Sequence, residues 1–143
     1  MNLCYTAQDL APLARDLGYG GPPFPWDAER RFQIRCELDA FFFHLYLPST
    51  PEGNWRPART AEGNVVDETD AQLSAIKARF PTPRHAAAYI LDQFPIVRRN
   101  DEARFGRYRT KERILELYDA MQEAIASRRP YRSPLDPPPG TGP

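Results

Sequence analysis

Residues 28–46 read AERRFQIRCELDAFFFHLY and form the strongest helical pattern in this 143-residue chain. The large apolar side chains recur at intervals of three and four positions, which places them on one face of a helix. They are Ile34, Leu38, Phe41 and Leu45, with Phe42 widening the face. Asp27 is a good N-cap residue just before the run, and Pro48 just after it cannot continue a helix. The stretch therefore predicts a long amphipathic helix over 28–46.

The helical signals on either side of this stretch are weaker. A first helix is expected over 6–17, where Thr6 is the candidate N-cap residue and Pro12 is expected to kink or split the helix. A capping box at its start predicts a short helix over about 70–80. Both helices have only three or four apolar residues at helical spacing, so they are expected to be short.

Two proline residues bound the next helix. Thr82 is a good cap and Pro83 stands at the first helical position, so a helix is expected to begin there and to end before Pro95. Asn100 is then expected to cap a single helical turn that closes at Gly106.

The last helix is expected to begin after Thr110, as its N-cap residue, and to reach about Ser127. Its apolar side chains again recur at intervals of three and four positions, which predicts a buried stripe. The stripe consists of Ile114, Tyr118, Met121 and Ile125, broadened by Leu115 and Leu117.

The connections are long and rich in proline and glycine. Residues 18–26 are expected to form a structured loop held by its aromatic side chains, and residues 49–67 an exposed loop or insertion. No segment alternates apolar and polar residues as a strand would. The sequence therefore predicts a mainly α protein: a small helical domain of about four helices over 1–129, followed by an extended, proline-rich tail over 130–143.

The charge of the chain is balanced overall but unevenly distributed. The formal net charge is zero, yet residues 1–72 hold six Arg and eleven Asp or Glu, whereas residues 73–143 hold thirteen Arg or Lys and eight Asp or Glu. The chain has no apolar run long enough to span a bilayer and no signal-peptide pattern at its start, so no membrane partner and a cytoplasmic location are expected.

The most suggestive basic segment is residues 98–113, RRNDEARFGRYRTKER, where Phe105 and Tyr108 stand among the charges. Basic groups interleaved with aromatic rings suit a nucleic-acid backbone. The candidate DNA-binding residues are Arg98, Arg99, Arg104, Arg107, Arg109, Lys111 and Arg113. The alternative is that these side chains pair locally with acidic neighbours and that the two rings face the core.

No arrangement of residues in the sequence predicts catalysis. Cys4, Cys36, His44 and His85 lack zinc-site spacing, so no metal is expected. A lone histidine is more often a packing residue than a catalyst, and neither histidine is assigned a role. A P-loop, a glycine-rich S-adenosylmethionine loop and a nuclease motif are missing from the sequence. The sequence Asp-Pro-Pro-Pro at 136–139 lacks the aromatic residue with which DNA methyltransferases stack a flipped base.

Four stretches of the chain resemble the C-terminal end of large adenine-specific DNA methylases of the type IIG-like restriction-modification and phage-defence classes. The most specific strings are Phe94 to Glu102, FPIVRRNDE, and Gly106 to Lys111, GRYRTK. The full set comprises residues 5–26, 30–46, 89–121 and the closing LDPPP.

This resemblance implies a position in a larger enzyme and not an activity. In that family the motifs for S-adenosylmethionine and for the target base lie upstream, and none of those residues can be carried over to this chain. The resemblance implies a non-catalytic C-terminal helical module, with DNA and the catalytic portion of the methylase as partners and no cofactor of its own. The alternative is a structural module that docks on the methylase or on another defence-system subunit without contacting DNA.

Overall fold

The computed structural model describes residues 3–47, 49–57 and 71–136, and the side chains of 71–73 are not among those described. Over these residues the chain is mainly helical, as predicted, and contains no strand beyond a single bridge between Ser49 and Trp55. The elements are a 3-10 turn η1 (Gln8–Leu10) and the helices α1 (Ala11–Asp16), α2 (Ala28–Tyr46), α3 (Ala71–Arg79), α4 (Pro83–Asp92), α5 (Pro95–Phe105) and α6 (Arg109–Ser127). None of the helices found in the described part is long and apolar enough to cross a membrane.

The chain divides into two compact units. Unit 1 comprises Met1–Leu38 and Arg132–Pro143, and unit 2 comprises Asp39–Tyr131. Helix α2 contributes its first half to unit 1 and its last residues to unit 2.

Unit 1 is built around an aromatic cluster of Tyr5, Tyr19 and Phe24. The Tyr19 ring stacks on Phe24 with centroids 5.0 Å apart and meets Tyr5 edge-on at 5.9 Å, and the Phe24 amide donates to the Tyr5 carbonyl. This confirms that aromatic side chains hold the 18–26 loop. The first predicted helix is split, as expected from Pro12, into η1 and α1, and Pro12 stands in the first turn of α1, where its missing N–H costs nothing. The predicted cap at Thr6 was wrong, because the N-cap residue of η1 is Ala7.

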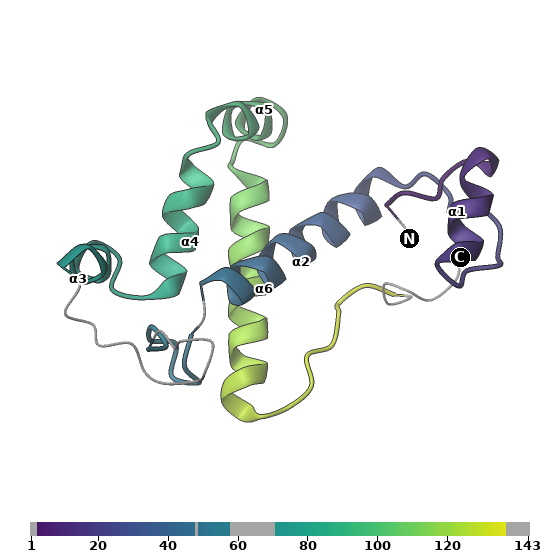
Figure 1. The fold of residues 1–143 in the computed structure, drawn as a ribbon. Coiled ribbons are helices and arrows are strands. Elements are labelled where there is room, and N and C mark those ends of the chain that lie inside the picture. The colour runs from purple at the N-terminus through teal and green to yellow at the C-terminus, as the bar shows by residue number, and fades with distance from the viewer. Residues whose placement is uncertain (1–2, 48, 58–70, 137–143) are drawn as a thin grey trace. The chain divides into compact units, whose positions relative to one another are not determined.

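Unit 2 forms around α6. Helices α4 and α6 lie side by side, and α5 lies across one end of the pair (Figure 1). The interior is formed by α4 and α6, because their apolar residues face each other at helical spacing. The buried residues are Ala86, Ala87 and Leu91 of α4 with Ile114, Leu117, Tyr118 and Met121 of α6. The predicted stripe is therefore confirmed except at Ile125, which is exposed.

Helix α2 has the predicted bounds, and Ile34 of its predicted apolar face is buried, but the part of α2 in unit 2 buries a different face. Ala40 is fully buried, and Phe43, His44 and Leu47 are partly buried, which is the spacing of one helix face. This face is rotated by about one residue, roughly 100°, from the predicted apolar face. Because α2 is apolar on several sides, the spacing of its largest residues did not identify the side that packs.

The segment between α4 and α6 differs most from the prediction. The cap at Thr82 is confirmed, since its hydroxyl accepts from the His85 amide. Pro95, however, begins a new helix in addition to closing the previous one, and α5 runs for 11 residues instead of a single turn at Asn100. Gly106 does close it, in the left-handed conformation at φ 71°.

The start of α6 is capped from another helix. Thr110 is not the N-cap residue, which is Tyr108 without a side-chain cap. Instead, the carboxylate of Asp101 on α5 accepts from the Thr110 amide at 2.6 Å. A carboxylate suits this place because it satisfies an amide that has no partner within the helix and opposes the positive end of the helix dipole.

The described part of the predicted 49–67 loop is tied to the helices; residues 58–67 lie outside the described residues. Ser49 is buried and its hydroxyl donates to the Gln122 side chain at 2.6 Å, which in turn donates to the Thr50 carbonyl at 2.9 Å. The Trp55 indole donates to the Phe80 carbonyl at 2.7 Å. Residues 49–57 are therefore a short fixed turn on α6 and not a freely exposed loop.

Candidate functional site

The predicted DNA-binding residues lie on α5, on the turn that follows it and on the first turns of α6 (Figure 1). Four of the seven are engaged by carboxylates. Arg98 Nε lies 2.7 Å from Glu102 Oε1, Lys111 Nζ 2.7 Å from Asp92 Oδ2 and Arg113 Nη1 2.7 Å from Glu116 Oε2, and Arg107 pairs with Glu112. Such exposed pairs add little to stability, but each carboxylate reduces the attraction of its cation for phosphate.

The other three basic residues do not take part in those ion pairs. Arg104 and Arg109 lie over the Phe105 ring, with their Cζ atoms 5.2 and 4.8 Å from its centroid. Arg99 is exposed on α5 and forms no ion pair with any residue that the structure describes. The structure therefore brings Arg104 and Arg109 together at the Phe105 ring. Arg98, Arg107, Lys111 and Arg113 instead form ion pairs with carboxylates.

Tyr108, the second aromatic residue of the basic segment, is structural. Its ring is buried and its hydroxyl donates to the Leu91 carbonyl at 2.8 Å, which joins the α5–α6 turn to the end of α4. Burial raises the pKa of the Tyr108 phenol, since the charged form loses solvation there. Tyr108 is thus unable to stack on a nucleic-acid base while the fold is intact.

An apolar groove of about 310 Å³ lies between α2 and α4. Its walls come from Phe42, Phe43 and Tyr46 on one side and from Ile90 and Phe94 on the other. We call this the α2–α4 groove. Asp39 and the Tyr46 hydroxyl are the polar groups among the described residues that line it, and the remaining lining side chains are apolar, so it fits an apolar ligand or side chain.

The aromatic side chains at the rim of the α2–α4 groove are exposed to solvent to a large extent. Phe42 is 45% exposed, Phe94 50% and Tyr46 74%. Single exposed apolar residues are common, but aromatic rings gathered around one groove are typical of surfaces that bind other molecules. Sequence analysis did not assign these residues a site, although the three consecutive phenylalanines at 41–43 were a signal that one helix face could not bury them all.

A second groove of about 460 Å³ lies on the other flank of α2, against the end of α6. Phe41 and His44 line it from α2, and Met121 and Ile125 from α6. The chain that leaves α6 completes it with Arg128, Arg129 and Tyr131. We call this the α2–α6 groove. Sequence analysis did not single out its two arginines.

His44 joins α2 to α6. Its ring stacks on Tyr118 with centroids 3.9 Å apart, and its Nε2 lies 3.0 Å from the Tyr118 carbonyl, which can only accept. Nδ1 is therefore the unprotonated nitrogen, and it is buried without a hydrogen-bond partner in the described part of the chain. Burial lowers the pKa of His44, so the ring is neutral and acts in packing.

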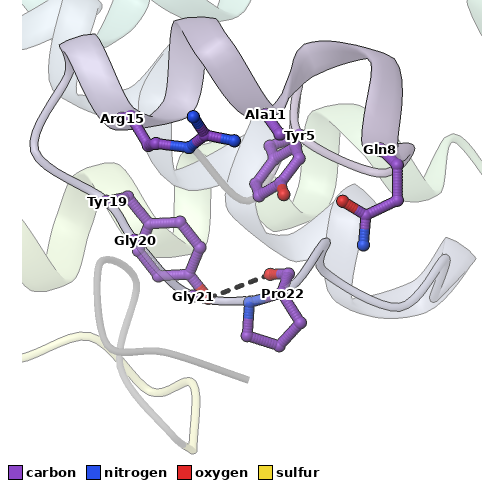
Figure 2. Close-up of a pocket in the computed structure, with 8 residues that line it drawn as sticks. All are labelled: Tyr5, Gln8, Ala11, Arg15, Tyr19, Gly20, Gly21 and Pro22. Atoms are coloured by element: carbon purple, nitrogen blue, oxygen red, sulfur yellow. Dashed lines mark hydrogen bonds between the residues drawn. The ribbon is translucent and has the colours of Figure 1, made fainter.

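Unit 1 contains a separate polar hollow of about 250 Å³ between the η1–α1 segment and the Tyr19–Pro22 loop (Figure 2). The Tyr19 hydroxyl donates to the Pro22 carbonyl at 3.1 Å across the loop. A Cβ atom at Gly21 would lie 2.5 Å from that hydroxyl, so only glycine leaves room for the ring. Arg15 and Gln8 also line the hollow. Its shape follows from the packing of Tyr19 in the aromatic cluster of unit 1, so we assign it no binding role.

The described residues contain no cluster of three or more His, Cys, Asp or Glu side chains that could hold a metal ion. Comparisons of the chain with protein-family models, with curated proteins and with solved structures find no match. The resemblance to adenine methylases therefore stays a prediction, and the geometry of unit 2 is the basis for assigning a function.

Proposed function

We propose that this chain is a non-catalytic docking module that binds another protein through the α2–α4 groove. The exposure of Phe42, Tyr46 and Phe94 around that groove is the observation that supports the proposal. The ion pairs of the basic segment support it as well, because they compensate much of the charge with which the segment would attract DNA.

The energetics favour aromatic anchors. Full burial of one large apolar side chain is worth about 1.5–3 kcal/mol, so three rings that start about half exposed or more supply a useful part of a binding free energy. They must offset the cost of association and of ordering the interface. Aromatic residues at the centre of an interface commonly supply most of the affinity.

The partner we propose is the catalytic portion of a DNA adenine methylase. The resemblance of Phe94 to Glu102 and of Gly106 to Lys111 to the C-terminal end of such enzymes supports it. Phe94 belongs both to the first string and to the rim of the groove. S-adenosylmethionine would then be bound by the partner.

The test is titration of the chain with the catalytic portion of a cognate adenine methylase, followed by calorimetry. Phe42→Ser and Tyr46→Ser should each weaken binding at least tenfold, which corresponds to about 1.4 kcal/mol. Ile76→Ser on α3 is the matched control, since Ile76 is 51% exposed and does not line the groove. Equal affinity of all variants would refute docking at this groove, as would binding that requires DNA.

A second candidate function is DNA contact through Arg99, Arg104 and Arg109. The observation that favours it is the position of Arg104 and Arg109 around Phe105, which leaves a cationic aromatic surface at the α5–α6 corner. Arginine on an aromatic face and beside phosphate is a common arrangement in nucleic-acid binding.

Fluorescence anisotropy with duplex DNA tests this candidate. Three phosphate contacts would give a slope of log K against log salt of about −2.7. Arg99→Glu with Arg104→Glu should abolish the binding, whereas Arg98→Glu with Arg107→Glu, which makes the same change in charge at cations already paired with Glu102 and Glu112, should reduce it less. Equal losses from both changes would mean that the whole segment acts by its net charge, and no binding at low salt would dismiss the candidate.

A further inference from the structure

The α2–α6 groove combines an apolar floor with two cations at its end. Phe41 and Ile125 are exposed on either side of it, and Met121 closes the floor. Arg128 and Arg129 follow α6 directly and line the same groove. The groove is therefore lined almost wholly by apolar surface, and two cationic residues stand among its lining residues.

Neither arginine is neutralised. Arg128 and Arg129 are exposed, and their guanidinium groups make no ion pair or hydrogen bond with any residue of the described chain. In the same unit, Arg84, Arg98 and Arg107 each have a carboxylate partner. The charge at the end of the groove is thus available to an external anion.

The backbone at Arg128 provides an independent observation. Arg128 ends α6 in the left-handed conformation, at φ 54° and ψ 32°, and it is the one non-glycine residue with positive φ in the described chain. Glycine is usual at this position, because a Cβ atom is strained there. The attraction of one exposed cation to the helix C-terminus does not exceed that strain, so fold stability does not explain an arginine here.

We propose that the α2–α6 groove binds an acidic amphipathic segment of a partner protein. An apolar side chain of that segment packs between Phe41 and Ile125, and its carboxylates accept hydrogen bonds from Arg128 and Arg129. The strained backbone at Arg128 is retained because it places the guanidinium at the groove.

The shape of the site favours a peptide segment over a small acid. Residues from the last turns of α6 line the groove, and two adjacent exposed arginines follow them, which suits several carboxylates on one helix face. A fatty acid has one carboxylate and needs an enclosed pocket for its chain. The proposal goes beyond docking at the α2–α4 groove and does not depend on it.

The experiment measures binding of the whole chain to a labelled synthetic helical peptide of about 15 residues, with leucines on one face and glutamates beside them. A matched peptide has every glutamate replaced by glutamine, and dodecanoate serves as the acid without a peptide. We expect the acidic peptide to bind, the glutamine peptide to bind at least tenfold more weakly and dodecanoate not to compete.

Three variants localise the binding. Arg128→Gly and Arg129→Ser should each weaken the acidic peptide about fivefold, the effect of losing one exposed charge pair worth about 1 kcal/mol. Phe41→Ser should weaken both peptides. Arg99→Ser, which removes one positive charge away from the groove, is the control and should leave binding unchanged.

Stability separates this role from a structural one. Arg128→Gly relieves the strained backbone, so its unfolding midpoint should stay the same or rise while binding falls. Equal binding of the two peptides, an equal effect of Arg99→Ser, or displacement by dodecanoate would overturn the proposal. Loss of the methylase interaction in Phe42→Ser with peptide binding intact would show that the two grooves act separately.

Discussion

Two helix faces in unit 2 have apolar side chains at helical spacing, but one face is buried and the other is exposed. On α6, Ile114, Tyr118 and Met121 are buried against α4. On α2, Phe41 and Leu45 are four positions apart, as Ile114 and Tyr118 are on α6, and both are about half exposed. The comparison teaches that periodicity identifies an apolar face but not its partner. The α6 face is covered by this chain, whereas the α2 face is exposed.

The largest expected effect comes from deleting the same amount of apolar side chain on the two faces. Ile114→Ala should cost about 2–5 kcal/mol of unfolding free energy, because Ile114 is 1% exposed and a cavity would remain. Leu45→Ala should change it by less than about 0.5 kcal/mol, as is usual for surface positions. Urea denaturation measures both. A loss of unfolding free energy at Leu45 comparable to that at Ile114 would show that the α2 face is packed within the fold as the α6 face is.

A smaller effect is expected at the polar side of α6. Gln122→Ala removes hydrogen bonds to Ser49, Thr50 and Pro51, and the bonds to Ser49 and Thr50 are partly buried. The expected cost is about 1–3 kcal/mol. Gln93→Ala, which removes only a local bond to the Tyr89 carbonyl, is the control. If thermal unfolding shows no difference between the two variants, the 49–57 turn is not anchored on α6.

Stabilisation is expected at the end of α6. Arg128→Gly should raise the unfolding free energy by about 0.5–1 kcal/mol, since glycine adopts the left-handed conformation without the penalty of a Cβ atom. Such a rise would show that Arg128, an exposed residue of unit 2, is not the residue that fold stability favours at this position. Destabilisation of the variant would instead assign Arg128 to the fold.

The smallest expected effect is a pH dependence at the contact between α2 and α6. Burial holds the pKa of His44 below 6.5, its value in the unfolded chain. The folded state therefore binds fewer protons at this ring, and stability is lost as the pH falls from 6.5 towards the lowered pKa. The loss between pH 7.5 and 5.5 should be smaller in His44→Gln, as measured by denaturation. An unchanged pH profile would exclude His44 as its source.

Much of the fold could be predicted from the sequence. The bounds of α2, the cap at Thr82, the close of α5 at Gly106 and the buried stripe of α6 follow from local chemistry. The errors have tertiary causes. Asn100 lies within α5 because Pro95 starts that helix five residues earlier, and α6 is capped by Asp101 from a neighbouring helix.

The candidate site could be predicted only in part. The alternative of local pairing, which the sequence offered, holds for Arg98 with Glu102 and for Arg113 with Glu116. The carboxylate that engages Lys111 belongs to Asp92, 19 positions away, and becomes apparent only in the folded chain. Both grooves depend on which side of α2 packs, and the sequence does not determine this when Ala40 is buried and His44 partly buried in place of larger residues. The strain at Arg128 likewise requires a backbone angle.

The hydrogen bond from Trp55 to the Phe80 carbonyl joins two points 25 positions apart along the chain. Whatever sequence connects them begins and ends at neighbouring points in space. Lengthening a closed segment of this kind adds only about 0.6 kcal/mol of entropy cost for each doubling of its length. The position therefore offers a graft point, where a recognition sequence of different length could be exchanged while α4, α5 and α6 keep their packing.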